Sequence, residues 1–297
     1  MATPLTADRI VAALRAEGIK VVEHPGWRGH HRNHVGKWGP VNGVMIHHTV
    51  SSGTTHSVEL CFTGYDKLPG PLCHGVIAKD GTVHLISDGR ANHAGGGDPD
   101  VLAAVQKESY DTRPPAPNEH QGSPGAVDGN ARFYGFECIN LGDGVDPWPA
   151  VQVEAIVRAS AALSRAHGWG AKSVIGHSEW SDWKSDPKGP DNVVSMPGLR
   201  KRIADRLAHP ASWNPGDKPT TPKPPAPQPP TETDMEPIDF WNYRNAKADE
   251  ASVKAGHGRI PDAYGYLVLT NQLVVKLNAA VDTLTKKVAE LEARTRP

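Results

Sequence analysis

Three short segments of the chain carry side chains that can together bind a catalytic metal ion. His47 lies in Ile-His-His-Thr, His177 in Gly-His-Ser and Asp186 in Lys-Ser-Asp-Pro. Two imidazoles and one carboxylate supply three ligands, which leaves the fourth position of a tetrahedral zinc ion for water. Because this donor set is typical of catalytic rather than structural zinc sites, the sequence predicts metal-assisted hydrolysis.

Each of these residues also has an ordinary explanation. A histidine at the end of a strand is more often hydrogen-bonded or exposed than bound to a metal, and Asp186 before Pro187 can simply begin a turn. The chain contains no compact His-Glu-x-x-His motif. Spacing alone therefore indicates a metal site without establishing it.

Glu137 and Lys184 are the further candidates for catalytic roles. Glu137 lies in the otherwise apolar segment Phe133–Ile139, where an unpaired buried carboxylate would be costly. The alternative is a strand glutamate that faces solvent. If Glu137 faces the metal, it can take a proton from the attacking water, whose pKa zinc lowers to about 7. Lys184, close to Asp186 in sequence, can then stabilise the oxyanion of a tetrahedral intermediate.

The candidate ligands follow apolar runs that are typical of buried strands. A turn at Asp80-Gly81 between two alternating apolar segments, His74–Ala78 and Thr82–Ile86, predicts a hairpin. The other segments that predict strands are residues 41–46, 133–139 and 174–176.

Helical patterns alternate with these strands. Thr6–Glu17 predicts an amphipathic helix with Thr6 as its N-cap, and Trp148–His167 predicts a longer helix that ends before Gly168. Pro197 is suited to the first turn of a further helix. We therefore expect an α/β fold in which a mixed β-sheet is flanked by α-helices.

The segment Gly95–Asn130 is rich in Gly, Pro, Asp and Asn, with a short helical pattern near Val101–Lys107. A loop of this length in a compact domain is usually functional or disordered. We expect it to form the rim of a substrate cleft, and the alternative is a tolerated insertion.

A proline tract at residues 214–230 predicts an extended spacer, with a ligand for proline-binding modules as the alternative. We accordingly expect four parts, which are an N-terminal helix packed on the catalytic domain (1–20), the catalytic domain (21–212), a Pro-rich linker (213–235) and a helical C-terminal module (236–297).

The C-terminal module contains valines and leucines in two heptad series, Val274, Val281 and Val288 with Leu277, Leu284 and Leu291. Valine at a and leucine at d favour a parallel two-stranded coiled coil, which would make the protein a homo-oligomer. The alternative is a single amphipathic helix that packs on its own domain. The module can thus serve oligomerisation or targeting.

Composition excludes several other classes of function. Lys plus Arg is 32 and Asp plus Glu is 33, so the net charge of -1 does not favour nucleic acid as a partner. Three cysteines, Cys61, Cys73 and Cys138, form no disulfide framework and are expected to be buried thiols. With no signal-peptide pattern or long apolar run, we expect synthesis without an export signal and no membrane insertion.

An ordered set of segments also resembles a known family. The set is Val44–Thr49, the hairpin around Asp80-Gly81, Asn92-His93-Ala94-Gly95, Gly135-Phe136-Glu137, Gly176-His177-Ser178 and Lys184–Pro187. Together these segments resemble the zinc-dependent N-acetylmuramoyl-L-alanine amidases of the type-2 family, which are related to peptidoglycan recognition proteins. The resemblance covers about residues 41–208.

The resemblance implies a role for each matching residue. His47, His177 and Asp186 match the zinc ligands, and the third position is Cys in other members. Glu137 matches the catalytic glutamate and Lys184 the lysine that stabilises the transition state. The reaction would be hydrolysis of the amide between the lactyl group of N-acetylmuramic acid and L-alanine.

Three more residues are candidates for substrate contacts by the same resemblance. His48 and His93 would lie near the site and shape the cleft rather than bind the metal. Tyr65 is available for the position of the family's substrate-contacting tyrosine.

The resemblance and the domain order together suggest a bacteriophage endolysin, made in the host cytoplasm, that reaches peptidoglycan once the membrane has been permeabilised. A cytoplasmic amidase that recycles wall fragments is an alternative, but it needs neither spacer nor heptads. A peptidoglycan-binding module without catalysis is the other alternative, and it usually lacks a complete ligand set.

Overall fold

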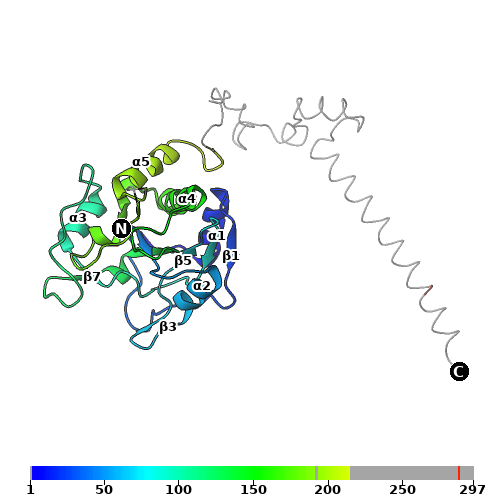
Figure 1. The fold of residues 1–297 in the computed structure, drawn as a ribbon, viewed down its shortest axis with the longest axis horizontal. Helices are drawn as coiled ribbons and strands as arrows, with labels where there is room; N and C mark the ends of the chain where they lie inside the picture. The colour runs from blue at the N-terminus through cyan, green and yellow to red at the C-terminus, as the bar shows by residue number, and fades with distance from the viewer. Residues whose placement is uncertain (1, 191–192, 215–286, 288–297) are drawn as a thin grey trace, which may run out of the picture. The chain divides into compact units, whose positions relative to one another are not determined.

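The apolar segments of the sequence form the strands of one mixed sheet. The computed structural model describes residues 2–190, 193–214 and 287 (Figure 1). The sheet has the order β1-β6-β5-β9-β2-β10, in which β5 and β6 are antiparallel and all other neighbours are parallel. Its strands are β1 (Val21–Glu23), β2 (Gly43–His48), β5 (Gly75–Ile77), β6 (Val83–Leu85), β9 (Phe133–Cys138) and β10 (Val174–Gly176).

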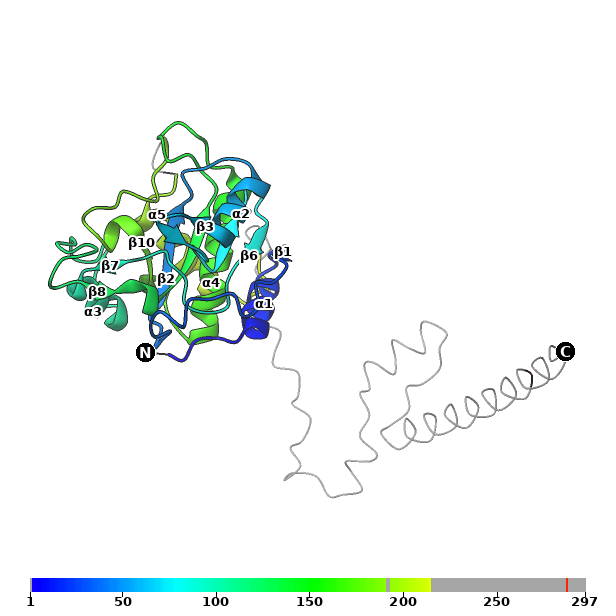
Figure 2. The same ribbon diagram turned by 90° about the horizontal axis from the view of Figure 1, so that it is seen from below.

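Helices lie on both faces and at the edges of this sheet, which confirms the expected fold class. Figures 1 and 2 show α1 beside β1 at one edge of the domain and α3 with β7 at the opposite edge. The helices are α1 (Ala7–Ala16), α2 (Thr54–Thr63), α3 (Pro99–Lys107), α4 (Ala150–His167) and α5 (Met196–Leu207). Shorter elements are β3 (Gly64–Tyr65), β4 (Leu68–Pro69), β7 (Gly96–Gly97), β8 (Val127–Asp128), η1 (Gly129–Ala131), η2 (Ala171–Ser173) and η3 (His177–Glu179).

The predicted helix ends are confirmed where a cap is visible in the sequence. The Thr6 side chain accepts a hydrogen bond from the backbone N–H of Arg9, and Gly168 ends α4 in the left-handed conformation at φ 71°. The sequence patterns do not predict α2. This helix buries only Ser57, Val58 and Cys61, and no side chain caps its start at Gly53.

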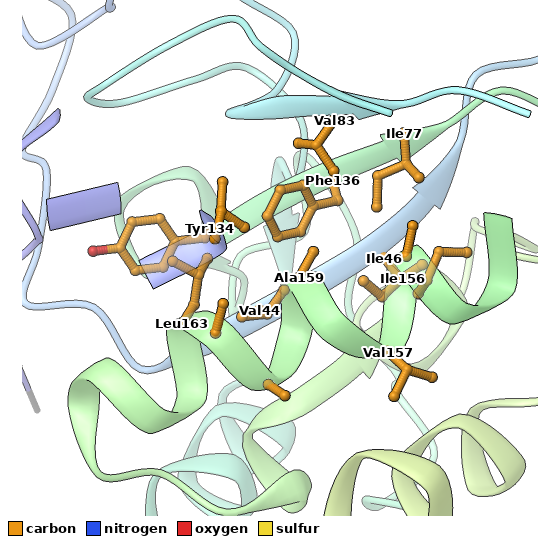
Figure 3. Close-up of a cluster of buried hydrophobic side chains, with 14 of the residues drawn as sticks. Val44, Ile46, Ile77, Val83, Tyr134, Phe136, Ile156, Val157, Ala159 and Leu163 are labelled. Carbon is orange, nitrogen blue, oxygen red and sulfur yellow. The ribbon is translucent and has the colours of Figure 1, made fainter. Parts of the chain in front are cut away.

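The main core lies between the sheet and α4. Alternate residues of the two central strands, Val44 and Ile46 in β2 with Tyr134 and Phe136 in β9, are buried in the same cluster as Ile156 of α4 (Figure 3). Because side chains alternate along a strand, the residues between them face the other side of the sheet. The α4 face is thus structural, and the opposite face is available for a site.

A buried ion pair joins the end of α1 to α5. The side chains of Glu17 and Arg206 are each 1% exposed and form a charge-assisted hydrogen bond, and the Nε atom of Arg165 in α4 lies 2.9 Å from Glu17. Ile10 and Leu14 of α1 also belong to the main core. The N-terminal helix therefore packs on the rest of the domain.

The structure also bears on the predicted state of the cysteines, but not on the predicted C-terminal parts of the chain. Cys61, Cys73 and Cys138 are free and buried, as predicted. Within the part of the chain that the structure describes, no helix combines the length and the apolarity that crossing a bilayer requires. The proline tract after residue 214 and both heptad series lie outside the described residues.

Candidate metal centre

The parallel pairing of β2 and β9 places His47 beside Glu137. The register aligns Met45 with Gly135 and His47 with Glu137. Paired residues of neighbouring strands point to the same face, and for these positions that face lies opposite α4. Two of the predicted site residues, which are far apart in sequence, thus lie next to each other.

The three predicted metal ligands converge on one point. The Nδ1 atom of His47 lies 3.0 Å from Nδ1 of His177 and 3.1 Å from Oδ2 of Asp186, and the Nδ1 of His177 lies 3.3 Å from the same oxygen. His177 begins η3 directly after β10, and Asp186 lies in the loop that follows. Strand ends and one loop therefore bring the predicted ligands together.

A relay of hydrogen bonds assigns the tautomer of His47. The Nε2 atom of His93 lies 3.0 Å from the carbonyl oxygen of Phe133, which can only accept, so Nε2 of His93 carries the proton. Burial lowers the pKa of His93 well below its usual value, so the ring is neutral and its Nδ1 accepts from Nε2 of His47 at 3.0 Å. Burial also lowers the pKa of His47, to about 4, which leaves its Nδ1 unprotonated at neutral pH.

The second imidazole is oriented in the same way. The Nε2 atom of His177 lies 3.2 Å from the carbonyl oxygen of Ala94, so Nε2 donates and, in the neutral ring, Nδ1 presents a lone pair. Burial opposes ionisation of Asp186, but the adjacent His177 and His47 more than offset this and hold the pKa of its carboxyl below the usual range. Three electron-pair donors thus face each other, an arrangement that fits a divalent cation.

Asn130 and Gly135 position His93. The Oδ1 atom of Asn130 accepts hydrogen bonds from the backbone N–H groups of His93 at 2.9 Å and Ala94 at 2.8 Å. A Cβ atom at Gly135 would lie 2.5 Å from Nδ1 of His93, so only glycine leaves room for the ring. The sequence reasoning missed Asn130, because no spacing rule links it to a histidine 37 residues earlier.

Glu137 has an unsatisfied buried oxygen on the same face. Its Oε2 atom is buried and has no hydrogen-bond partner within the described residues. Burial raises the pKa of Glu137 well above its usual value, the neighbouring Cys61 and Asp186 raise it further, and Lys184 opposes them. A buried carboxylate oxygen without a partner is rare and indicates a group that takes part in binding or chemistry.

The segment that carries these residues matches the model of a known protein family. The family model described as N-acetylmuramoyl-L-alanine amidase, Amidase_2, matches residues 37–189, which span β2, β9, β10 and the three candidate ligands with Glu137, His93 and Asn130. The chain belongs to this family. No curated relative matches the chain in sequence.

Several solved structures are similar to parts of the amidase. A crystal structure of an AmpD derivative is 19% identical, covers 62% of this chain and 94% of its own, and has a TM-score of 0.38. AmpDh3 from Pseudomonas aeruginosa, solved with an anhydromuramic pentapeptide, is 21% identical, covers 50% and 56%, and has a TM-score of 0.35. The endolysin amidase LysCS from Clostridium intestinale is 18% identical, covers 60% and 93%, and has a TM-score of 0.33. The family assignment rests on the match to the family model, because the sequence identities and TM-scores of these structures are too low to support it.

The other predicted site residues of the amidase differ in their exposure and in whether they line the cavity beside His177. Lys184 is exposed and lines a cavity together with His177 and His93. His48 is buried, and its Nδ1 accepts the backbone N–H of Lys188 at 3.3 Å, so it holds the loop that carries Asp186. Tyr65 is 57% exposed on β3 and is not among the residues that line this cavity.

The long segment Gly95–Asn130 forms much of the cavity wall in the amidase. The cavity has a volume of about 630 Å³ and extends from His93 and His177 to Gln121 and Ser123. The segment contains α3, β7 and β8, and Asp98 caps α3 by accepting backbone N–H groups. The segment expected to form a rim is therefore a structured wall of a cavity that reaches His177, one of the three candidate ligands.

Proposed function

We propose that the protein is a zinc-dependent amidase that hydrolyses the bond between the lactyl group of N-acetylmuramic acid and L-alanine in peptidoglycan. The observation that carries this proposal is the convergence of His47 Nδ1, His177 Nδ1 and an Asp186 oxygen within 4.8 Å of one another. Two nitrogens and one carboxylate oxygen are ligands that zinc prefers, and they leave one position open.

When bound by these residues, zinc would supply Lewis-acid polarisation of the scissile carbonyl and of the attacking water. Glu137 would accept the proton of that water and pass it to the leaving amine of L-alanine. Its unpartnered Oε2 and its place beside His47 support this role. Lys184, exposed on the cavity wall, would donate hydrogen bonds to the oxygen that becomes negatively charged.

We further propose that the enzyme acts as a phage endolysin on intact walls. The proline tract at 214–230 and the heptads beyond it favour an appended segment for targeting or self-association, which a recycling enzyme does not require. The cavity is partly open to solvent, which a polymeric substrate requires for access. A recycling amidase would act instead on free muropeptides.

Digestion of purified cell walls tests both parts of the proposal. Mass spectrometry of the products should find new L-alanine amino termini and intact lactyl-bearing glycan, and a chelator should stop their release until zinc is added back. Cleaved sugar linkages or peptide cross-bridges would contradict the assigned bond. Turnover of free muropeptides without attack on whole walls would contradict the endolysin role.

A further inference from the structure

A tryptophan lies exposed on the wall of the cavity. Trp183 is 67% exposed and lines the cavity together with Lys184 and His177. An exposed indole costs free energy in water, because its apolar faces are not buried. Trp183 has no role in the proposed mechanism, although it directly precedes Lys184 in the sequence.

His120 covers one face of this indole. The two rings are stacked with centroids 3.5 Å apart and an angle of 15° between their planes. A parallel ring at this distance covers one face only, so the exposure of Trp183 belongs to its edges and its other face. His120 belongs to the Gly95–Asn130 segment, and Trp183 belongs to the loop after η3. The long segment thus supports the indole of that loop.

The stacked pair is held in place from both segments. The Nδ1 atom of His120 lies 2.9 Å from Oδ1 of Asp182, and the His120 backbone N–H donates to the hydroxyl of Ser123 at 2.9 Å. The backbone N–H of Asp182 also donates to the carbonyl of Glu119 at 3.3 Å. The indole is thus preorganised, which lowers the entropy cost of binding a ligand on its free face.

Apart from Lys184, which the proposed mechanism assigns to the oxyanion, the cavity wall near Trp183 is lined mainly by uncharged polar groups and by one ion pair. Gln121, Ser123 and Ser181 line it. Arg90, which also lines it, is paired with Asp128 at 2.7 Å. Amide and hydroxyl groups match the hydroxyl and acetamido groups of an N-acetylated sugar better than the carboxylates of a stem peptide.

We propose that the Trp183–His120 pair is a platform for a pyranose ring of the glycan strand. One face of a pyranose is lined by C–H groups, which an aromatic face can bury while the rim hydroxyls reach polar side chains. The platform would make Trp183 a specificity residue that favours glycan-borne over sugar-free substrates. This inference rests on the proposed amidase function, because it names the part of that substrate that binds here.

Kinetics of Trp183→Ala on two substrates test the platform. One substrate is a disaccharide carrying the lactyl-peptide, and the other is the D-lactoyl-peptide without sugar. The ratio of kcat/KM for the first substrate to that for the second should fall about tenfold, the size expected for the loss of one aromatic stacking contact. Trp183→Phe should recover part of the ratio, and His120→Ala should lower it less than Trp183→Ala.

Trp213 supplies a matched control. It stacks on His209 with centroids 4.2 Å apart and planes at 12°, but it is not among the residues that line the cavity. Trp213→Ala should leave the substrate ratio at the wild-type value. A ratio that falls equally in both tryptophan variants would overturn the platform, because it would reflect a general effect of losing an indole.

Binding of peptide-free glycan gives a measurement that does not depend on turnover. In wild-type protein, oligomers of N-acetylated disaccharide should shift the indole N–H signal that is missing from the NMR spectrum of Trp183→Phe. No shift with glycan, or a shift with free stem peptide instead, would overturn the proposal. If the wild type released no lactyl ends, the amidase function would fail on its own, whatever the indole signal did.

Discussion

The Nε2 atom of His47 lies 3.0 Å from Nδ1 of His93, and this contact fixes which nitrogen of His47 faces the other two ligands. His93 is fixed in turn by the carbonyl of Phe133 at 3.0 Å. Partners of this kind orient a ligand and raise its basicity. The proposed metal centre therefore depends on a histidine outside the set of His47, His177 and Asp186.

Removal of His93 should weaken metal binding. In His93→Ala, the Nε2–H group of His47 loses its acceptor, so the ring can turn or change tautomer, and zinc affinity should fall about 10- to 100-fold. His93→Gln, whose side-chain oxygen can accept the same proton, should lose less. Competition with a chromogenic chelator measures both constants. Equal affinity in wild type and His93→Ala would mean that the relay does not position His47.

Substitution of Glu137 should separate hydrolysis from metal binding. Glu137→Gln keeps the size of the side chain but cannot accept a proton, so kcat should fall by about 10²- to 10⁴-fold while zinc content stays at the wild-type level. Glu59→Gln changes an exposed glutamate of α2 and serves as the control. Near-normal turnover by Glu137→Gln would remove this residue from the mechanism.

The parts of the fold that local pattern predicts are those with strong apolar runs or visible caps. β2, β9 and β10 are buried almost throughout, so their continuous apolar segments stand out in sequence. β1 and α2 were missed, because β1 spans only Val21–Glu23 and α2 buries few apolar side chains. Tertiary contacts, rather than local propensity, determine such short elements.

In the candidate site, too, some features could be predicted from the sequence and others could not. His47, His177 and Asp186 could be named from sequence because each stands in a distinctive segment that the family resemblance matches. The contacts that orient these three side chains could not be predicted from sequence. Asn130 bonds to His93 across 37 residues, and His120 stacks on Trp183 although several strands and the helix α4 lie between them in the chain, so only the folded backbone brings these pairs together.

Loss of the buried charge at Glu17 should destabilise the domain strongly. Glu17→Gln leaves Arg206, whose side chain is 1% exposed, with only the more distant carboxylate of Glu154 at 3.8 Å, and the free energy of unfolding should fall by about 3–5 kcal/mol. Asp8→Asn breaks an exposed pair with Arg28 and should barely change the denaturation midpoint, because solvent screens that pair. Urea denaturation of the metal-free proteins gives both values. Similar losses in the two variants would contradict a special role for the buried pair.

Acid should destabilise the fold through His74. Burial lowers its pKa from 6.5 to about 3, against a raising effect of the Gly89 backbone, and its Nδ1 accepts the N–H of Gly135. Because the folded-state pKa is below the unfolded value, this contribution is complete above about pH 6.5 and is lost as the pH falls toward 3.

The difference in unfolding free energy between wild type and His74→Gln reports this loss. In metal-free protein it should shrink by about 2 kcal/mol between pH ~7.5 and pH ~5, because glutamine does not titrate. A constant difference across this range would show that His74 is not held neutral by the fold.

The position of zinc in crystals of the protein tests the central claim most directly. Anomalous scattering at the zinc edge should give one strong peak about 2.0–2.2 Å from Nδ1 of His47, Nδ1 of His177 and a carboxylate oxygen of Asp186. A peak elsewhere, coordination through Nε2, or no peak after zinc loading would contradict the account.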